Sequence, residues 1–148
     1  MLPCIADWRV MICSVEDFKE IVNCRYLMSP TPYLTVESVE ELATEFITNV
    51  LREECISIDI HHILFYGSRA FGCPKENSDI DILLLYESEE EREDDLFDLF
   101  ASKEYEIEGY HVDVNPVQVS AGDVPSYLGW VLTSVKQLHE EVDLDARE

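Results

Sequence analysis

The chain has few basic residues and no long hydrophobic run. It holds 10 lysines and arginines against 32 aspartates and glutamates, which gives its 148 residues a formal net charge of −22. Such a charge repels the phosphates of a long polynucleotide, so binding along DNA or RNA is disfavoured. The longest apolar run, from Ile82 to Tyr86, has five residues, whereas a membrane-spanning helix needs about 20. The sequence therefore predicts neither a protein that binds long nucleic acids nor a membrane protein.

Cysteine is too sparse and too scattered to build a scaffold. The five cysteines are odd in number and form no C-x-x-C pair, so neither a zinc ribbon nor a disulfide framework is indicated. The first residues lack the basic segment and the long apolar run of a secretory leader. We therefore expect reduced thiols and a cytoplasmic location. The cysteines are Cys4, Cys13, Cys24, Cys55 and Cys73.

The apolar content is nevertheless sufficient for a folded core. Hydrophobic residues make up 47% of the chain, and the length suits one domain. Residues 1–33 read differently from the rest: a short helix is predicted from Ser14, and Pro30 and Pro32 then interrupt any helix. We interpret residues 1–33 as an N-terminal appendage and linker of unknown role, and residues 34–148 as the domain.

Within that domain, hydrophobic periodicity predicts helices and strands in alternation. Apolar residues at helical spacing indicate two amphipathic helices, short branched or aromatic runs indicate strands, and the acidic run from Glu87 to Asp95 is a solvated loop or the first turns of a helix. This order predicts an α/β (α+β) fold. The expected elements are a helix over Thr35–Cys55, strands over Ile60–Tyr66, Asp79–Tyr86 and Tyr105–Val117, a helix ending near Phe100, and a helix over Val124–Leu138 that Asp123 precedes.

A Gly-Ser pair and a D-x-D pair flank the turn between the first two predicted strands. Gly67 and Ser68 leave the first strand, where free backbone N–H groups and a hydroxyl suit a polyphosphate. After ten residues come Asp79 and Asp81, whose spacing of two places both carboxylates on one face of a strand. Two neighbouring anions suit a hard divalent ion such as Mg²⁺, which takes further ligands from substrate phosphates. Two solvent-exposed acids on a one-sided sheet are the alternative.

The last predicted strand offers a third carboxylate. In the stretch from His111 to Asn115, alternation places Asp113 opposite the valines, and His111 on the face of Asp113. If this strand lies beside the D-x-D strand, Asp113 joins the same site. Three carboxylates and two metal ions are a set that supports phosphoryl transfer.

These residues resemble the polymerase-beta-type nucleotidyltransferase superfamily, and in particular its minimal nucleotidyltransferase branch, for which G-S-x10-D-x-D is the signature. The resemblance covers about residues 36–120 and implies a small mixed sheet flanked by helices. It implies an NTP donor, with ATP expected, whose triphosphate lies at Gly67 and Ser68, and Mg²⁺ or Mn²⁺ on Asp79, Asp81 and Asp113. Members of the family often carry an arginine after the Gly-Ser pair, so Arg69 either contacts phosphate or lies exposed on a helix surface.

The resemblance implies transfer of a nucleoside monophosphate to an acceptor hydroxyl, with Asp113 helping to deprotonate the acceptor. The branch includes antitoxins that adenylylate a tyrosine on a partner toxin of the HEPN type, and this is the acceptor that we expect. A small cationic acceptor such as an aminoglycoside suits the acidic charge, but relatives with that activity carry an extra helical domain. A catalytically silent binding or antitoxin module is the alternative, and the oligomeric state is left open.

Overall fold

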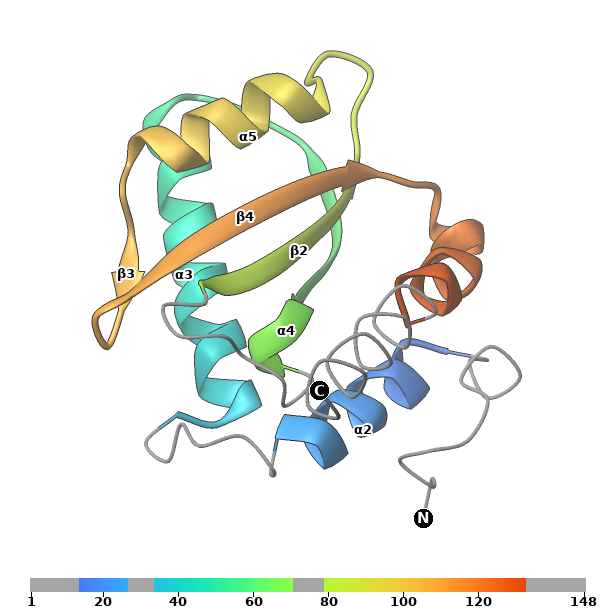
Figure 1. Cartoon of the computed structure of the whole chain (residues 1–148). Helices are drawn as coiled ribbons and strands as arrows, with labels where there is room; N and C mark the ends of the chain where they lie inside the picture. The colour runs from blue at the N-terminus through green and yellow to red at the C-terminus, as the bar shows by residue number, and fades with distance from the viewer. Residues whose placement is uncertain (1–13, 27–33, 71–78, 133–148) are drawn as a thin grey trace, which may run out of the picture.

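The computed structural model describes residues 14–26, 34–70 and 79–132 of the chain (Figure 1). No helix within these ranges combines the length and apolar character that a membrane crossing requires. A short helical stretch follows the last strand at residues 124–132. The other elements are α2 (Val15–Tyr26), α3 (Val36–Glu53), β1 (Asp59–Tyr66), α4 (Gly67–Ala70), β2 (Ile80–Glu87), α5 (Glu93–Ser102), β3 (Glu106–Ile107), β4 (Tyr110–Gln118) and the 3₁₀ turn η1 (Ala121–Asp123).

Four strands form a mixed sheet in the order β1-β2-β4-β3. The pair β1 and β2 is antiparallel, the pair β2 and β4 is parallel, and β3 and β4 form an antiparallel hairpin. The parallel pair requires a crossover, and α5 supplies it, packing on β4. The α+β fold with a small mixed sheet and flanking helices is confirmed.

Helix α3 shows how the sequence sets an element and its position. Thr35 and Ser38 form a capping box, in which the N–H of Ser38 donates to Thr35 Oγ1 and the N–H of Thr35 donates to Ser38 Oγ, both at 3.0 Å. Its apolar stripe is buried, and the helix lies behind the sheet in the view of Figure 1. The buried residues are Val36, Val39, Ala43, Ile47, Val50 and Leu51.

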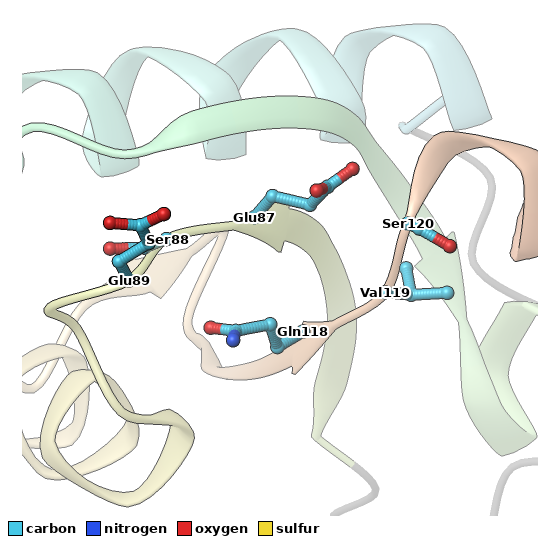
Figure 2. A pocket seen from close by; sticks show the side chains of 6 residues that line it. All are labelled: Glu87, Ser88, Glu89, Gln118, Val119 and Ser120. Carbon is cyan, nitrogen blue, oxygen red and sulfur yellow. The ribbon is translucent and has the colours of Figure 1, made fainter.

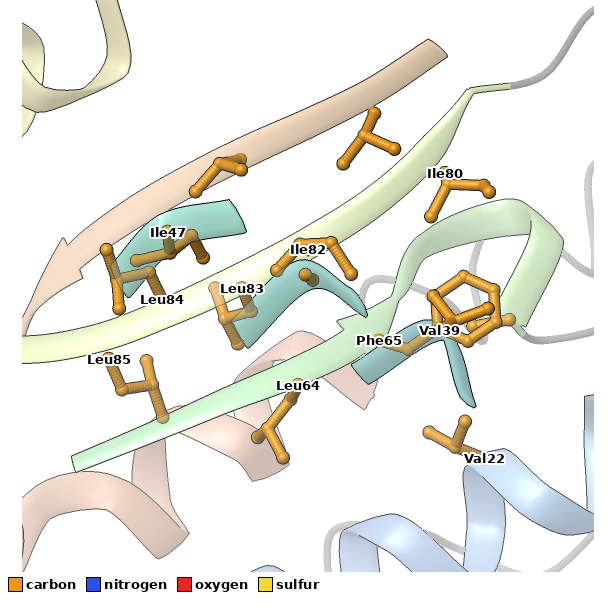
Figure 3. Packing of buried hydrophobic residues seen from close by; sticks show 14 of the residues in the cluster. Val22, Val39, Ile47, Leu64, Phe65, Ile80, Ile82, Leu83, Leu84 and Leu85 are labelled. Carbon is orange, nitrogen blue, oxygen red and sulfur yellow. The ribbon is translucent and has the colours of Figure 1, made fainter. Parts of the chain in front are cut away.

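Strand β2 forms the centre of the core. Side chains from Ile80 to Tyr86 are buried with the exception of Asp81, which is half-buried. Successive side chains point to opposite faces, so both faces of the strand are covered, as expected for a strand in a parallel pair. Figure 3 shows five of these side chains, Ile80 and Ile82–Leu85, together with Ile47 of α3 and Leu64 of β1.

Helix α2 lies in the stretch that the sequence sets apart as an appendage, yet it contributes to the same core. Phe18, Ile21 and Val22 are at most 1% exposed and belong to the core cluster of the sheet. The helix contacts α3 and α4. Residues 27–33 lie outside the described residues, so the expected boundary at residue 33 stays a prediction.

The single strand predicted over residues 105–117 is wrong. Glu108 and Gly109 have φ angles of 52° and 86° and form a turn between β3 and β4. Two consecutive residues with positive φ match a tight hairpin turn. The sequence concealed this turn because a glutamate, rather than asparagine or aspartate, precedes the glycine. The expected extension of the last helix to Leu138 lies outside the described residues.

Candidate metal and nucleotide site

Three polar residues form one row across the sheet. Tyr66 of β1 is in register with Asp81 of β2, and Asp81 is in register with Asp113 of β4. Residues paired directly across strands share a face, so the phenol and the two carboxylates lie side by side. The predicted proximity of Asp113 to the D-x-D pair follows from this register.

Asp79 joins Asp113 and His111 just before β2 begins. Each of the three offers one ligand atom, and these atoms lie within 4.8 Å of one another. His111 Nε2 is 3.1 Å from Asp113 Oδ1. Burial raises the pKa of Asp79, and its hydrogen bond to Asp113 and the charge of that carboxylate raise it further. The sequence placed His111 on this face but did not include it among the ligands.

Asp81 is directed at the turn that follows β1. Burial raises its pKa to about 7, and the charges of Asp113 and Asp79 act in the same direction. Gly67 has a φ of 89°, and a Cβ on this residue would lie 2.9 Å from both Cβ and Cγ of Asp81. Glycine is therefore required at position 67 both by backbone conformation and by the close carboxylate.

The same turn is held from the side of the helices. Glu40 of α3 accepts a hydrogen bond from the backbone N–H of Phe65 at 2.8 Å through Oε2, one residue before the row across the sheet. Arg69 of α4 is only 5% exposed, and its guanidinium carbon lies 4.1 Å from the centre of the Tyr110 ring. The exposed alternative for Arg69 is therefore wrong. The side chain of Ser68 lies outside the described residues.

Tyr66 is a site residue that sequence reasoning missed. Burial raises the pKa of its phenol, and the charge of Asp81 raises it further. The phenol therefore stays protonated at neutral pH and is a hydrogen-bond donor rather than a base. Strand alternation alone could not find it, because its place depends on the register between β1 and β2.

A second acidic region lies at the opposite end of β2 and β4. A cavity of about 500 Å³ opens there (Figure 2). Glu87 Oε1 accepts hydrogen bonds from the N–H of Ala121 at 3.1 Å and from His61 Nε2 at 2.8 Å when that nitrogen is protonated. The cavity is lined by Glu87, Ser88, Glu89, Gln118, Val119 and Ser120.

The donor set at the Asp79 end of the sheet fits a divalent cation. Two carboxylates and an imidazole approach one another, and Asp81 stands beside them in the row. Burial raises the pKa values of Asp79 and Asp81, the neighbouring carboxylates raise them further, and a bound cation would favour the charged forms against both effects. Among the described residues, Asp81 is not in the group of three that reaches a common point, so its role as a ligand stays a prediction.

Comparison with known proteins gives a family. Residues 49–144, well over half of the chain, match the family described as the nucleotidyltransferase domain. Neither the curated proteins nor the solved structures returned a match. The matched region contains the turn at Gly67, the D-x-D pair and Asp113. The chain therefore belongs to the nucleotidyltransferase domain family.

Proposed function

We propose that the protein transfers AMP from ATP to a hydroxyl group on a partner protein in the cytoplasm. The observation that carries the proposal is the meeting of Asp79, Asp113 and His111 beside Asp81, in a chain of the nucleotidyltransferase domain family. Acidic side chains that face one another are suited to a metal-assisted group transfer rather than to fold stability.

In this proposal, different residues of the site bind the triphosphate and the metal ions. Gly67, Ser68 and Arg69 bind the triphosphate, because the turn offers backbone N–H groups and Arg69 brings a positive charge close to Asp79. Asp79, Asp81 and Asp113 hold the Mg²⁺ or Mn²⁺ ions. A bound divalent cation offsets the charge of the polyphosphate and makes a hydroxyl easier to deprotonate.

Asp113 acts on the acceptor side. Its side chain is 34% exposed, whereas the side chain of Asp81 lies against Gly67. An accessible carboxylate can take the proton of an incoming hydroxyl. Tyr66 stays protonated beside Asp81, so it can serve as a hydrogen-bond donor but not as the base. The new bond joins the acceptor oxygen to the α-phosphorus, and pyrophosphate leaves.

The acceptor is a basic protein in this proposal. The net charge of −22 disfavours a polynucleotide end and favours a cationic partner. Helix α5 adds to this field, because its first turn carries Glu93, Asp94 and Asp95. The resemblance to the minimal nucleotidyltransferase branch points to a toxin of the HEPN type, modified on a tyrosine.

The test is transfer of label from ATP to the product of the neighbouring reading frame, if that frame encodes a small all-helical protein. Label at the α-phosphate should appear on a tyrosine of the partner, and label at the γ-phosphate should not. The variant Asp79→Asn serves as the control without transfer. Binding and neutralisation of the partner without label would favour the silent antitoxin module, whereas label on an aminoglycoside would favour a small-molecule acceptor.

A further inference from the structure

We propose that His111 supplies a nitrogen ligand to the cation at Asp79 and Asp113, so that this site binds transition-metal ions such as Mn²⁺, Co²⁺ and Zn²⁺ in preference to Mg²⁺. The inference rests on the proposed function in that it concerns the cation of the same site. It departs from the sequence-based expectation, which assigned the ions to Asp79, Asp81 and Asp113 alone.

The backbone places His111 in the site. His111 and Asp113 are two residues apart in β4, so their side chains leave the same face of the strand. The side chains are 39% and 34% exposed, and an ion can therefore reach them from solvent. Asp79 completes the group from the position just before the neighbouring strand β2.

The distances suit coordination of a single ion. Two ligand atoms bound at about 2.1 Å and at a right angle are separated by about 3.0 Å. His111 Nε2 and Asp113 Oδ1 are 3.1 Å apart, so both can bind one ion at adjacent positions with little movement. The third ligand atom, from Asp79, lies within 4.8 Å of both, close to the separation of about 4.2 Å between two ligands on opposite sides of one ion.

A second histidine and carboxylate pair shows what distinguishes this group. His61 Nε2 lies 2.8 Å from Glu87 Oε1, but that oxygen also accepts the N–H of Ala121. No third ligand is grouped with this pair among the described residues. His61 and Glu87 therefore provide a matched control with the same chemistry outside the site.

A nitrogen ligand changes which ions the site prefers. Mg²⁺ favours oxygen ligands and keeps its water, whereas imidazole favours the later first-row ions. With imidazole in place of one of three oxygen ligands, the affinity of the site should therefore increase from Mg²⁺ to Mn²⁺ to Co²⁺. Asp81 would then be left to a second ion or to the polyphosphate side.

The direct test is pulsed electron paramagnetic resonance of Mn²⁺ bound to the full chain without nucleotide. Protein labelled with ¹⁵N-histidine should show a coupling between Mn²⁺ and the imidazole nitrogen that shifts from the ¹⁴N to the ¹⁵N pattern. This measurement needs no variant and so does not depend on a mutant that folds. His111→Gln should lose the coupling, and His61→Gln should keep it.

Calorimetry with the metal ions alone provides the second readout. His111→Gln should weaken Co²⁺ binding by about ten-fold or more and Mg²⁺ binding much less, and His61→Gln should change neither. Absence of nitrogen coupling in the parent, or equal losses for Co²⁺ and Mg²⁺ in His111→Gln, would overturn the proposal. Nitrogen coupling in a chain that transfers no label would instead refute the proposed function and leave the metal ligand standing.

Discussion

Acidic side chains lie at both ends of the parallel pair β2 and β4, and the two groups differ in what surrounds their carboxylates. At the carboxyl end, Glu87 accepts the N–H of Ala121, and Glu93 Oε1 accepts the N–H of Gln118 at 3.0 Å. Each of these two carboxylates therefore has a backbone hydrogen-bond donor as its partner. These acids connect the loops after β2 and β4 to the sheet.

At the other end the carboxylates face one another. The pKa of Asp81 is raised to about 7 and that of Asp79 is also raised, in both cases by burial and by neighbouring carboxylates. The fold tolerates this repulsion where a cation is expected. The acids at the carboxyl end therefore support the structure, whereas those at the Asp79 end are available for chemistry. The cavity of about 500 Å³ lies at the carboxyl end.

The largest expected difference between variants at the two ends is in the rate of label transfer from ATP. Asp113→Asn removes the base on the acceptor side, and the rate of label transfer should fall by about 10² to 10⁴. ATP affinity, measured by calorimetry with the metal ion in excess, should be largely retained, because the proposal places the triphosphate on the turn at Gly67 and on the metal held by the D-x-D pair. Glu87→Gln at the other end should leave transfer unchanged and lower the unfolding free energy by about 1 kcal/mol. Equal losses of transfer in both variants would abolish the distinction between the two ends.

The metal-binding end should also control how ATP affects stability. With Mg²⁺ or Mn²⁺ present, ATP at about 100 times its dissociation constant adds about 2.7 kcal/mol, which corresponds to several degrees in Tm. With EDTA the stabilisation should disappear, because the carboxylates then repel the triphosphate. Thermal melts in the two conditions provide the measurement. A shift of the same size in EDTA would show that ATP binds away from the acidic site.

Among the described residues, two glycines have a positive φ, and they give a sharper local test. Gly67→Ala combines backbone strain with the contact against Asp81, and it should cost about 2 kcal/mol or more. Gly109→Ala, at a φ of 86° with nothing within 4 Å of its Cβ, has the strain alone and should cost about 1 kcal/mol. Denaturant unfolding of both variants measures the difference. If the two costs were equal, the contact of Gly67 with Asp81 would have no energetic weight.

The smallest effect concerns pH. Because the folded-state pKa of Asp81 is about 7, above its ordinary value near 4, its contribution to stability is fully present below pH 4 and is lost as pH rises through 7. Metal-free Asp81→Asn should therefore equal or exceed the parent at pH 8, by about 1 kcal/mol, and should not transfer AMP. Unfolding titrations at pH 5 and 8 measure this, and Glu87→Gln should retain the dependence of the parent. Marked destabilisation of Asp81→Asn would identify Asp81 as a structural hydrogen-bonding residue.

Strong local patterns made much of this molecule predictable. The stripe of α3, the apolar runs of β1 and β2, and the spacing of Gly67, Asp79 and Asp81 are each contained within a short stretch of sequence. Alternation in β4 correctly placed His111 and Asp113 on one face. These features depend on the period of a helix or strand, which the order of residues sets directly.

Other features depend on how distant segments meet. Tyr66 enters the site only through the register of β1 on β2, and the buried guanidinium of Arg69 packs on the ring of Tyr110 from β4. The turn at Glu108 and Gly109 required φ angles that the residue types suggest only weakly. Sequence periodicity shows which face of a strand is buried, but it does not identify the residue that lies opposite on a neighbouring strand.

Helix α2 shows that the region that matches the family is smaller than the region that shares one hydrophobic core. The family match begins at residue 49, inside α3, yet Phe18 and Ile21 exclude water from the same interior as the matched strands. A protein trimmed to the matched residues would leave that interior uncovered on the side of α4, whose Gly67 and Arg69 form the turn of the site. Sequence matching finds the residues that relatives share, whereas cooperative folding depends on every segment that keeps solvent out. An excised homology region would be an aggregation-prone fragment rather than a smaller enzyme.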